Sequence, residues 1–365
     1  MSKIKEKVVA VGEKITDKLP HKLKSDKKKN PPARITNDTV SEHREKVLAD
    51  GRKFKYPFQY AKYKIVINTI IVVIITIIVF SSWLWYMLYQ KQATSDFFYS
   101  ATKILSLPIA NVDGYNVSYS DYLRRVRSAV FYKENQEKID FNTQDGRSEL
   151  DYLKREELNR VIRMAYAAKI AKFKNITVSN KEIDEEIDNN LKDNNGDTMT
   201  RVDYENYVLK RYFGWTMNDY RTELRSQLLE RKVAFAIDTA AKDKITNVET
   251  RLKAGDDFAT IAREMSDDEA TREVGGGVSA EADDSDPSGL IAAARNLKEG
   301  EVSGIIQGVD GYYIVKLSSK TDDETKYLMI KVALKQFDND FNELRKTGKI
   351  KEYINIPEFD DIEKQ

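Results

Sequence analysis

The sequence predicts an α+β protein with a disordered basic tail, one transmembrane helix, a helical domain and a small mixed domain. Three observations lead to this class: an uncharged apolar run at 65–89, helical periodicity from Lys103 to about Ile245, and a glycine-rich stretch with short apolar strands after it. We expect these boundaries: 1–63 for the tail, 64–89 for the membrane helix, 103–245 for the helical domain, 246–334 for the mixed domain with its last strand, and 335–365 for a closing helix and extension.

Charge is unevenly distributed along the 365 residues, although the totals nearly balance, with 60 Lys and Arg against 59 Asp and Glu. Through Lys64 there are 18 basic and 8 acidic residues, which leaves 42 basic and 51 acidic residues in the remainder. A lysine-rich stretch with little apolar periodicity is typical of a solvated, largely disordered segment. Its lysines either contact anionic lipid head groups or only set the membrane topology, and we expect no nucleic-acid partner.

The apolar run at 65–89 carries no charged residue and would span about 37 Å as a helix. Aromatic residues flank both of its ends, as in the interfacial belts of membrane proteins, and the basic excess precedes it. A cleaved signal peptide is the alternative, but the run is too long and the segment before it is far longer than a normal n-region. We therefore expect a single-pass cell-membrane protein with a cytoplasmic N-terminus and extracytoplasmic C-terminal domains.

The composition excludes several kinds of site. The chain has no Cys, which excludes disulfides, thiol nucleophiles, thiolate metal sites and a lipid-bearing cysteine. Its two histidines, His21 and His43, both lie in the basic segment, so the main body has no histidine for catalysis or for zinc. The acidic stretch 282–289 lacks the spacing of an EF-hand, and we interpret it as a solvated loop. We expect neither a metal nor a cofactor.

The segment 103–245 has the pattern of a helical domain. Apolar residues from Leu150 to Ala165 fall on one helix face, and Ser179 with Glu182 predicts a capping box at the start of another helix. A module of this kind packs around itself and leaves grooves lined by apolar side chains.

The mixed domain ends in two apolar strands, at 312–318 and 326–334, which are joined by a polar turn. This arrangement predicts an antiparallel hairpin. The glycines at 275–277 predict a tight turn with positive φ and not a phosphate-binding loop, because no P-loop lysine follows them.

Two stretches resemble known families. The segment IANVDGYNVSYSDYLRRV at 109–126, with the helices through NKEIDEEID and FGWTMNDYRTELRSQLLERKV, resembles the N-terminal helical domain of SurA-like exported chaperones. Further on, G-x-D-F-A-x-I-A-x-x-x-S-D-D, GG-x-V, NLKEGEVSGII and DGYYIVKL follow one another as in the parvulin-type peptidyl-prolyl isomerase domain. The second resemblance implies a small FKBP-like fold that isomerises X-Pro bonds without a cofactor.

The parvulin resemblance also implies site residues. Asp268 matches the position of the family's Cys or Asp beside the isomerised bond, and Tyr313 replaces the histidine of its G-y-H-I motif, so both are candidate catalytic residues. The candidate substrate-binding residues match the apolar position after the paired glycines, the pocket aromatic and the family's other histidine: Val278, Leu290 and Leu328. Asp268 has an alternative role, as a cap of the helix that follows it.

The first strand of a parvulin domain is missing from its usual place, because the sequence before Gly255 has a nearly continuous helical pattern. KYLMIKV at 326–332 resembles the missing strand. The first and last strands of this fold are antiparallel neighbours, so the move requires only a short hairpin. We therefore expect a circularly permuted parvulin sheet.

Together the resemblances imply a membrane-anchored, extracytoplasmic folding factor of the PpiD type that acts as a parvulin-type isomerase, as a chaperone, or as both. Its expected partners are unfolded or proline-containing exported polypeptides and the membrane. Two alternatives stay open. One is a catalytically inactive holdase, and the other is a single-span structural or interaction anchor that acts through its basic tail.

Overall fold

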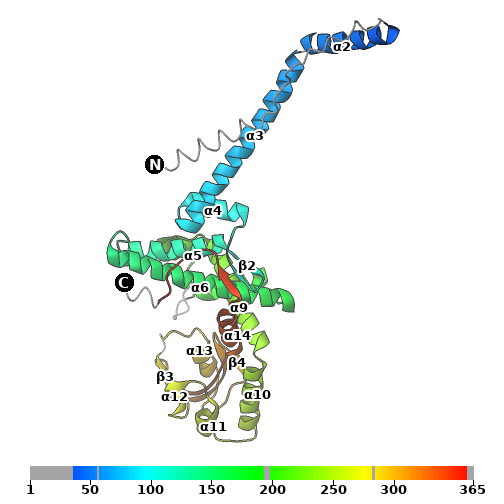
Figure 1. Cartoon of the computed structure of the whole chain (residues 1–365). Coiled ribbons are helices and arrows are strands. Elements are labelled where there is room, and N and C mark those ends of the chain that lie inside the picture. Colours follow the sequence, from blue (N-terminus) through cyan, green and yellow to red (C-terminus); the bar gives the residue numbers. More distant parts are fainter. Residues whose placement is uncertain (1–35, 56, 193–197, 282–283, 360–365) are drawn as a thin grey trace. The chain divides into compact units, whose positions relative to one another are not determined.

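Residues 36–55, 57–192, 198–281 and 284–359 are described in this computed structural model of the chain (Figure 1). They fall into two units, one that ends at Ile78 and one that starts at Val79. The second unit holds most of the helices, together with a three-stranded and a four-stranded sheet. The predicted α+β class is therefore confirmed.

Helix α2 (Asn37–Lys55) lies within the stretch that the sequence predicts as a disordered tail. The helix is capped at its start, because the backbone N–H groups of Thr36 and Thr39 donate to each other's hydroxyl oxygens at 2.9 and 3.4 Å. Good helix formers, namely Glu, Arg, Lys, Leu and Ala, fill nine of the 19 positions of the helix. The disorder prediction is wrong for this segment, while residues 1–35 lie outside the described part of the chain.

The predicted apolar span is helical. It is made of α3 (Pro57–Trp85) and a π-helical continuation, η1 (Tyr86–Gln90). Within the described residues, the stretch Tyr63–Gln90 is the one helix that is long and apolar enough to cross a membrane, with a mean hydropathy of 2.7. Its last turns enter a protein core, because Leu84 and Leu88 are buried and the Tyr119 hydroxyl donates to the Leu88 carbonyl oxygen at 2.6 Å.

Helices form most of the segment from Asp96 to Ile237. In chain order they are α4 (Asp96–Leu105), α5 (Tyr119–Tyr132), η2 (Lys133–Glu137), α6 (Gln144–Lys174), α7 (Asn180–Asn190), α8 (Arg201–Asp203), η3 (Tyr204–Phe213) and α9 (Met217–Ile237). Leu158, Val161 and Ile162 of α6 are buried in the shared core, as the predicted apolar face requires. The predicted capping box of α7 is confirmed, with the Glu182 N–H donating to the Ser179 hydroxyl and the Glu182 carboxylate accepting from the Ser179 N–H.

A hairpin interrupts the helices where the sequence predicts continuous helix. Strands β1 (Pro108–Val112) and β2 (Tyr115–Ser118) pair antiparallel. Asp113 and Gly114 connect them with φ of 46° and 87°, which is the geometry of a two-residue turn that matches strand twist. The helical prediction from Lys103 is therefore wrong at these two strands, because the Asp-Gly dipeptide outweighs the surrounding helical periodicity.

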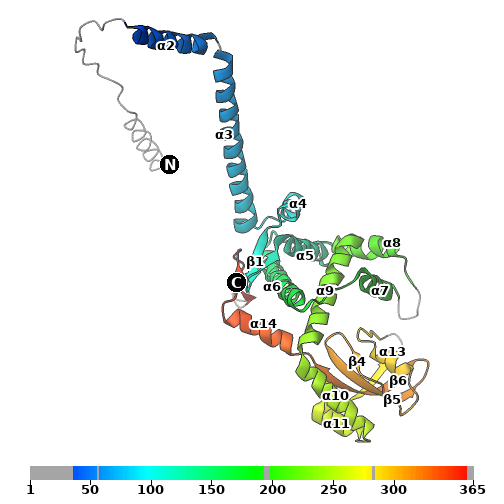
Figure 2. The same ribbon diagram turned by 90° about the vertical axis from the view of Figure 1, so that its right-hand side faces the viewer.

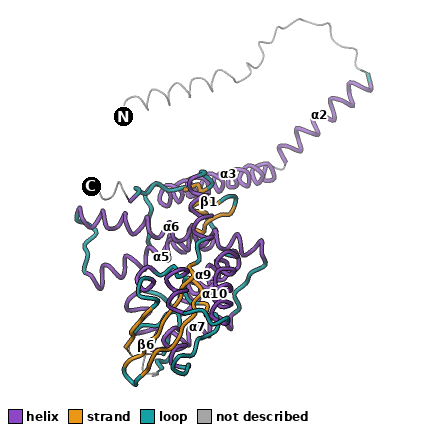
Figure 3. The backbone as a smooth tube through the Cα atoms, turned by 90° about the horizontal axis from the view of Figure 1, so that it is seen from below, coloured by secondary structure: helices purple, strands orange, loops and turns teal. Residues whose placement is uncertain are grey.

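The mixed domain contains an antiparallel sheet, whose strands are orange in Figure 3, with the order β3-β6-β5-β4. Its elements are α10 (Thr239–Lys253), α11 (Phe258–Met265), α12 (Glu269–Arg272), β3 (Gly277–Glu281), α13 (Leu290–Arg295), β4 (Ile306–Gln307), β5 (Gly311–Lys320) and β6 (Glu324–Ala333). Strands β5 and β6 pair from Tyr312 opposite Val332 to Lys320 opposite Thr325, which confirms the predicted hairpin. Helices α10 and α11 cover one face of the sheet and α13 the other (Figure 2).

After β6 the chain returns to the helical domain. Helix α14 (Gln336–Lys346) places Phe337 and Phe341 in the helical core, and β7 (Ile350–Glu352) pairs with β1. Arg155 of α6 fixes this return. Its buried guanidinium donates to the Glu352 carboxylate at 2.8 and 3.0 Å and to the carbonyl oxygens of Ile356 and Pro357. The mixed domain is thus inserted within the helical domain.

One carboxylate holds the two connections of the inserted domain together. Asp238, which is 4% exposed, precedes α10 and accepts from the Ala241 N–H at 2.9 Å. Its other oxygen accepts from the N–H groups of Lys335 and Gln336 at 2.7 and 3.0 Å, where the chain leaves the sheet. Burial alone would favour the neutral acid, but these three N–H groups outweigh it and lower the pKa of Asp238.

Replacing Arg155 by Met should lower the free energy of unfolding by about 3 kcal/mol, because buried acceptors lose their donor. Urea unfolding followed by far-UV circular dichroism measures the change. Arg160→Met is the matched control, since Arg160 lies on the same helix, is half-exposed and pairs with Glu156. That variant should lose less than about 1 kcal/mol. Equal unfolding midpoints for the two variants would contradict the role given to Arg155.

Asp238→Asn should destabilise the protein at neutral pH, because an amide puts a donor where the carboxylate accepts from backbone N–H groups. A carboxylate whose pKa is lowered by folding stabilises above its unfolded pKa of about 3.9 and loses this contribution as the pH falls through the folded value. The difference in Tm between parent and variant should therefore shrink below about pH 4. Asp243→Asn, at an exposed site on the same helix, should show no such difference. A pH-independent gap for Asp238→Asn would refute the assignment.

Candidate functional site

The strand register divides the side chains of the sheet between two faces. We call the face under α13 the α13 face. Its buried residues are Ala280, Leu290, Ala294, Tyr313, Val315, Leu317 and Tyr327, with Val278, Ile291, Ala293, Leu297, Ile306 and Met329 packed around them. The opposite face carries Tyr312, Ile314, Ile330 and Val332 against α10 and α11.

Three of the five residues that the sequence singles out come together on the α13 face. Tyr313 of β5 is 5% exposed, Leu290 opens α13, and Val278 lies on β3 opposite Tyr327. They belong to one apolar cluster although 35 residues of chain separate Val278 from Tyr313. The α13 face is therefore our candidate site.

Leu328 is not part of the α13 face. It pairs with Gly277 and Lys316 and packs with the cluster under α10 and α11, on the other side of the sheet. Leu328 therefore does not line the α13 face, because a shift of one residue along a strand moves a side chain to the opposite face, and its role in substrate binding stays a prediction. Its neighbour Tyr327 occupies the α13 face instead, and the alternation of side chains relative to Tyr313 could have identified it.

Asp268 acts as a helix cap in this structure. Its carboxylate accepts from the backbone N–H of Thr271 at 2.9 Å and from the Thr271 hydroxyl at 2.7 Å, at the start of α12. This is the alternative role that the sequence offers for the residue. The hydrogen bonds of the Asp268 carboxylate in the described residues are thus committed to its own turn and not to the α13 face.

A polar group that the sequence did not indicate lies at one end of the α13 face. The Tyr313 hydroxyl donates to the Asp310 carboxylate at 2.5 Å, and Lys331 Nζ donates to the other carboxylate oxygen at 2.6 Å. Burial and the hydrogen bond to Asp310 raise the pKa of Tyr313 to about 12. Burial also opposes ionisation of Asp310, but its two donors outweigh this and lower its pKa. Around neutral pH the phenol therefore keeps its proton beside an ionised carboxylate.

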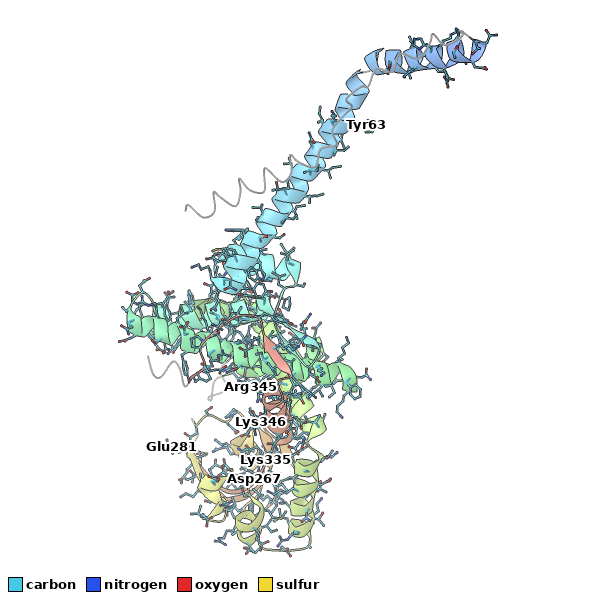
Figure 4. All side chains as sticks on the ribbon, in the orientation of Figure 1. Tyr63, Asp267, Glu281, Lys335, Arg345 and Lys346 are labelled. Atoms are coloured by element: carbon cyan, nitrogen blue, oxygen red, sulfur yellow. The ribbon has the colours of Figure 1, made fainter. Side chains whose placement is uncertain are left out.

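The loop between α11 and α12 is hydrogen-bonded to β6. Lys331 donates its N–H to the Ser266 hydroxyl at 3.2 Å, and the N–H of Asp267 donates to the Lys331 carbonyl oxygen at 2.7 Å. The Asp267 carboxylate also binds Lys244 and Lys335, each at 3.0 Å, and Figure 4 shows Lys335 beside it. Burial is again outweighed by these donors, which lower the pKa of Asp267.

Two glycines permit close contacts next to the site. Gly276 has a φ of 88°, and an added Cβ would meet the Met329 carbonyl oxygen at 2.3 Å. Gly275 has a φ of 75°, so the predicted positive-φ turn is confirmed at both positions. At Gly308 a Cβ would meet the Tyr313 ring at 2.6 Å. The Tyr313 ring can lie where it does because residue 308 lacks a side chain.

The helical domain has a cavity of about 470 Å³ lined by aromatic and charged residues. Phe213 stacks between Tyr132 and Trp215, with ring centroids 6.4 and 5.5 Å away. Beside them, the buried Arg125 is paired with Glu223 and Glu157. Trp215 Nε1 and Arg125 Nε are buried, and neither has a hydrogen-bond partner among the residues that the structure describes. The sequence predicts grooves lined by apolar side chains in this domain, whereas the lining of this cavity also includes charged side chains.

A second cavity, of about 610 Å³, lies along α9. Its lining includes the apolar side chains of Leu224, Leu228 and Phe337, several charged side chains, and Asp310. As for metals, no group of three or more Cys, His, Asp or Glu side chains in the described residues could hold an ion.

Comparison with known families covers most of the chain. A model described as SurA-like N-terminal domain matches residues 58–234, and a model described as PPIC-type PPIASE domain matches residues 230–319. The chain is similar to parvulin-type chaperones and isomerases. Its inserted mixed domain is parvulin-like, its helical domain is SurA-like, and the protein is a folding factor.

Individual relatives agree with this assignment. Foldase protein PrsA of Caldanaerobacter subterraneus subsp. tengcongensis is 28% identical over 274 residues, which cover 67% of this chain and 87% of the relative. Foldase protein PrsA of Clostridium botulinum (strain Langeland) is 34% identical over 126 residues, or 31% of this chain and 37% of the relative. This chain therefore spans well under half of the second relative's length.

Two solved structures of peptidylprolyl isomerase (PrsA) also match. The structure from Bacillus anthracis is 21% identical and covers 53% of this chain and 87% of that one, with a TM-score of 0.17. The structure from Bacillus cereus is 19% identical and covers 57% of this chain and 80% of that one, also with a TM-score of 0.17. These scores are too low to indicate a shared arrangement of the whole chains.

Proposed function

We propose that this protein is a membrane-anchored, extracytoplasmic folding factor that isomerises X-Pro bonds on the α13 face and holds unfolded exported polypeptides with its helical domain. The observation that carries the isomerase part is the Tyr313 hydroxyl, which donates to Asp310 at one end of the apolar cluster of the α13 face. Such a cluster suits a proline ring, and the hydroxyl becomes a donor beside the ring once it turns away from Asp310.

The chemistry requires no nucleophile and no proton transfer. Rotation about an X-Pro bond passes through a twisted amide, with a barrier of roughly 20 kcal/mol. A protein lowers this barrier when it binds the twisted form better than the planar form. On the α13 face, Val278, Leu290 and Tyr327 would hold the ring away from water. Tyr313 keeps its proton below a pKa of about 12 and has one O–H, which it would turn from Asp310 to the amide as the resonance of that amide is lost.

We further propose that the parvulin-like sheet is circularly permuted. Two findings support this. Strand β6 lies between β3 and β5, as a displaced first strand would, and the PPIC-type match ends at residue 319, before β6 begins. Under this proposal Tyr327, and not Leu328, takes the position that faces the site.

The proposed anchoring and topology are supported by one apolar helix and by the charge distribution. Tyr63–Gln90 is long and apolar enough to span a bilayer, and 18 of the first 64 residues are basic. Basic residues favour the cytoplasmic side, so the domains after the helix would lie outside the cytoplasm.

One observation favours a holdase without isomerase activity as the second candidate. Tyr313 is 5% exposed and its hydroxyl is already bound to Asp310, so a substrate has to displace side chains of the α13 face to reach it. The cavities of about 470 and 610 Å³ in the helical domain and along α9 need no such rearrangement.

The isomerase proposal predicts that the purified full chain, in detergent micelles, accelerates cis/trans isomerisation of a proline peptide. Tyr313→Phe should lower kcat/KM about tenfold, which corresponds to ~1.4 kcal/mol of lost hydrogen bonding in the transition state. Tyr312→Phe is the matched control, because Tyr312 is the adjacent tyrosine, equally buried, on the opposite face. It should retain the parent rate.

Asp268→Asn extends this test, because Asn keeps the cap of α12 and removes the charge. An unchanged isomerisation rate would show that Asp268 acts only as a cap. A lower rate would show that its charge contributes to catalysis. If the parent chain is no faster than the uncatalysed reaction, the isomerase part of the proposal fails and the holdase remains.

The chaperone part predicts that Tyr132→Ala weakens suppression of aggregation of an unfolded client. Tyr132 lines the cavity of about 470 Å³, and its loss should reduce client affinity by about 1 kcal/mol, or roughly fivefold. Light scattering at several chain concentrations measures this. Tyr212→Ala is the control, since Tyr212 is also 36% exposed but is not among the residues that line the cavity. A chain that never suppresses aggregation, but whose action depends on residues 1–50, would instead be the single-span anchor.

A further inference from the structure

Helix α4 has apolar side chains on two of its faces. Phe98 is buried in the helical core, and Thr102 is buried one turn later. Phe97 and Ile104 form a stripe on the neighbouring face, together with Ala101, which lies between them and packs against the edge of the core. Phe97 is 51% exposed and Ile104 81%, so most of this stripe has no protein covering it in the described residues. We call it the α4 stripe.

The α4 stripe is continuous with the end of the apolar helix. The Trp83 ring lies 6.0 Å from the ring of Phe97 and 5.6 Å from that of Phe98, measured between centroids. Trp85 and Tyr86 are also about half-exposed. Only residues 91–95 separate η1 from α4, and α4 lies beside the C-terminal end of α3 in Figures 1 and 2. Exposed aromatic side chains and the stripe thus form one apolar surface.

The connection between this helix end and the domain is not a free linker. Leu88 is fully buried in the helical core. The Tyr89 hydroxyl donates to the Pro108 carbonyl oxygen at 2.6 Å, and the N–H of Ala93 donates to the Met87 carbonyl oxygen at 3.0 Å. Because the last turns of the apolar helix are part of the domain core, α4 is held at a fixed position next to the place where that helix ends.

We propose that α4 is an interfacial helix whose stripe is embedded in the head-group region of the lipid bilayer, next to the end of the membrane span. This inference rests on the proposed membrane anchoring. Aromatic and long aliphatic side chains favour that region, whereas an exposed apolar patch in water is costly. Lys103, which lies 4.7 Å from the Tyr99 ring, can extend toward the phosphates. The acidic residue of α4, Asp96, is neutralised by Arg127.

The chain contains no cysteine, so a single introduced cysteine can be labelled uniquely. We would attach a nitroxide at Ile104→Cys in the full chain, reconstituted into nanodiscs of phosphatidylcholine and phosphatidylglycerol. Collision rates with oxygen, which concentrates in lipid, and with a water-soluble nickel complex report the surroundings of the label. The ratio of oxygen to nickel collisions should be several-fold higher at Ile104 than at the control Val274→Cys, an exposed apolar residue of the parvulin-like domain.

A third label, at Ile75→Cys in the apolar helix, separates the two proposals. If Ile75 is lipid-exposed while Ile104 behaves like Val274, the protein is anchored but the interfacial helix is refuted. If Ile104 is shielded from both reagents, a protein covers the stripe, either a second copy or a client, and the proposal is again refuted. If Ile75 also behaves like Val274, the membrane anchoring fails and the interfacial helix fails with it.

Discussion

The fold depends on how the Asp238 carboxylate joins two distant points of the chain. The chain enters the parvulin-like domain just after Asp238 and leaves it at Lys335 and Gln336, and one buried side chain binds the backbone at both points. A domain inserted in this way has two covalent connections to its host, so it cannot rotate freely as a domain on a single linker can. The α13 face and the cavities of the helical domain are therefore parts of one framework (Figure 2).

The same insertion makes the helical domain depend on the end of the chain. Strand β7 completes the sheet with β1, and Arg155 holds Glu352 and the residues after it, about two hundred positions away in the sequence. Contacts of such long range carry a cost in loop-closure entropy. The helical core is complete only when the segment after the parvulin-like domain has returned to it.

What the sequence could predict was set by how local each interaction is. The capping box at Ser179 and the β5–β6 hairpin involve neighbouring residues, and both predictions are confirmed. The turn at Asp113 is equally local, but the prediction for this segment followed the helical pattern around it and not the Asp-Gly dipeptide. Leu328 lies on the other face of the sheet. A motif match places a strand only to within one residue, whereas successive side chains of a strand point to opposite faces. The pairing of Arg155 with the C-terminal segment left no local pattern, so only the fold could show it.

The absence of histidine from the site limits what chemistry it can perform. An imidazole exchanges protons near neutral pH, whereas Tyr313, with a pKa of about 12, keeps its proton and Asp310 stays ionised. The pair therefore offers a hydroxyl that keeps its proton and a carboxylate that keeps its charge, and not an acid and a base. Prolyl isomerisation is a reaction that this arrangement suits, because it breaks no bond and requires only that a twisted amide be bound better than a planar one. A site that had to transfer protons could not tolerate the replacement of a histidine by Tyr313.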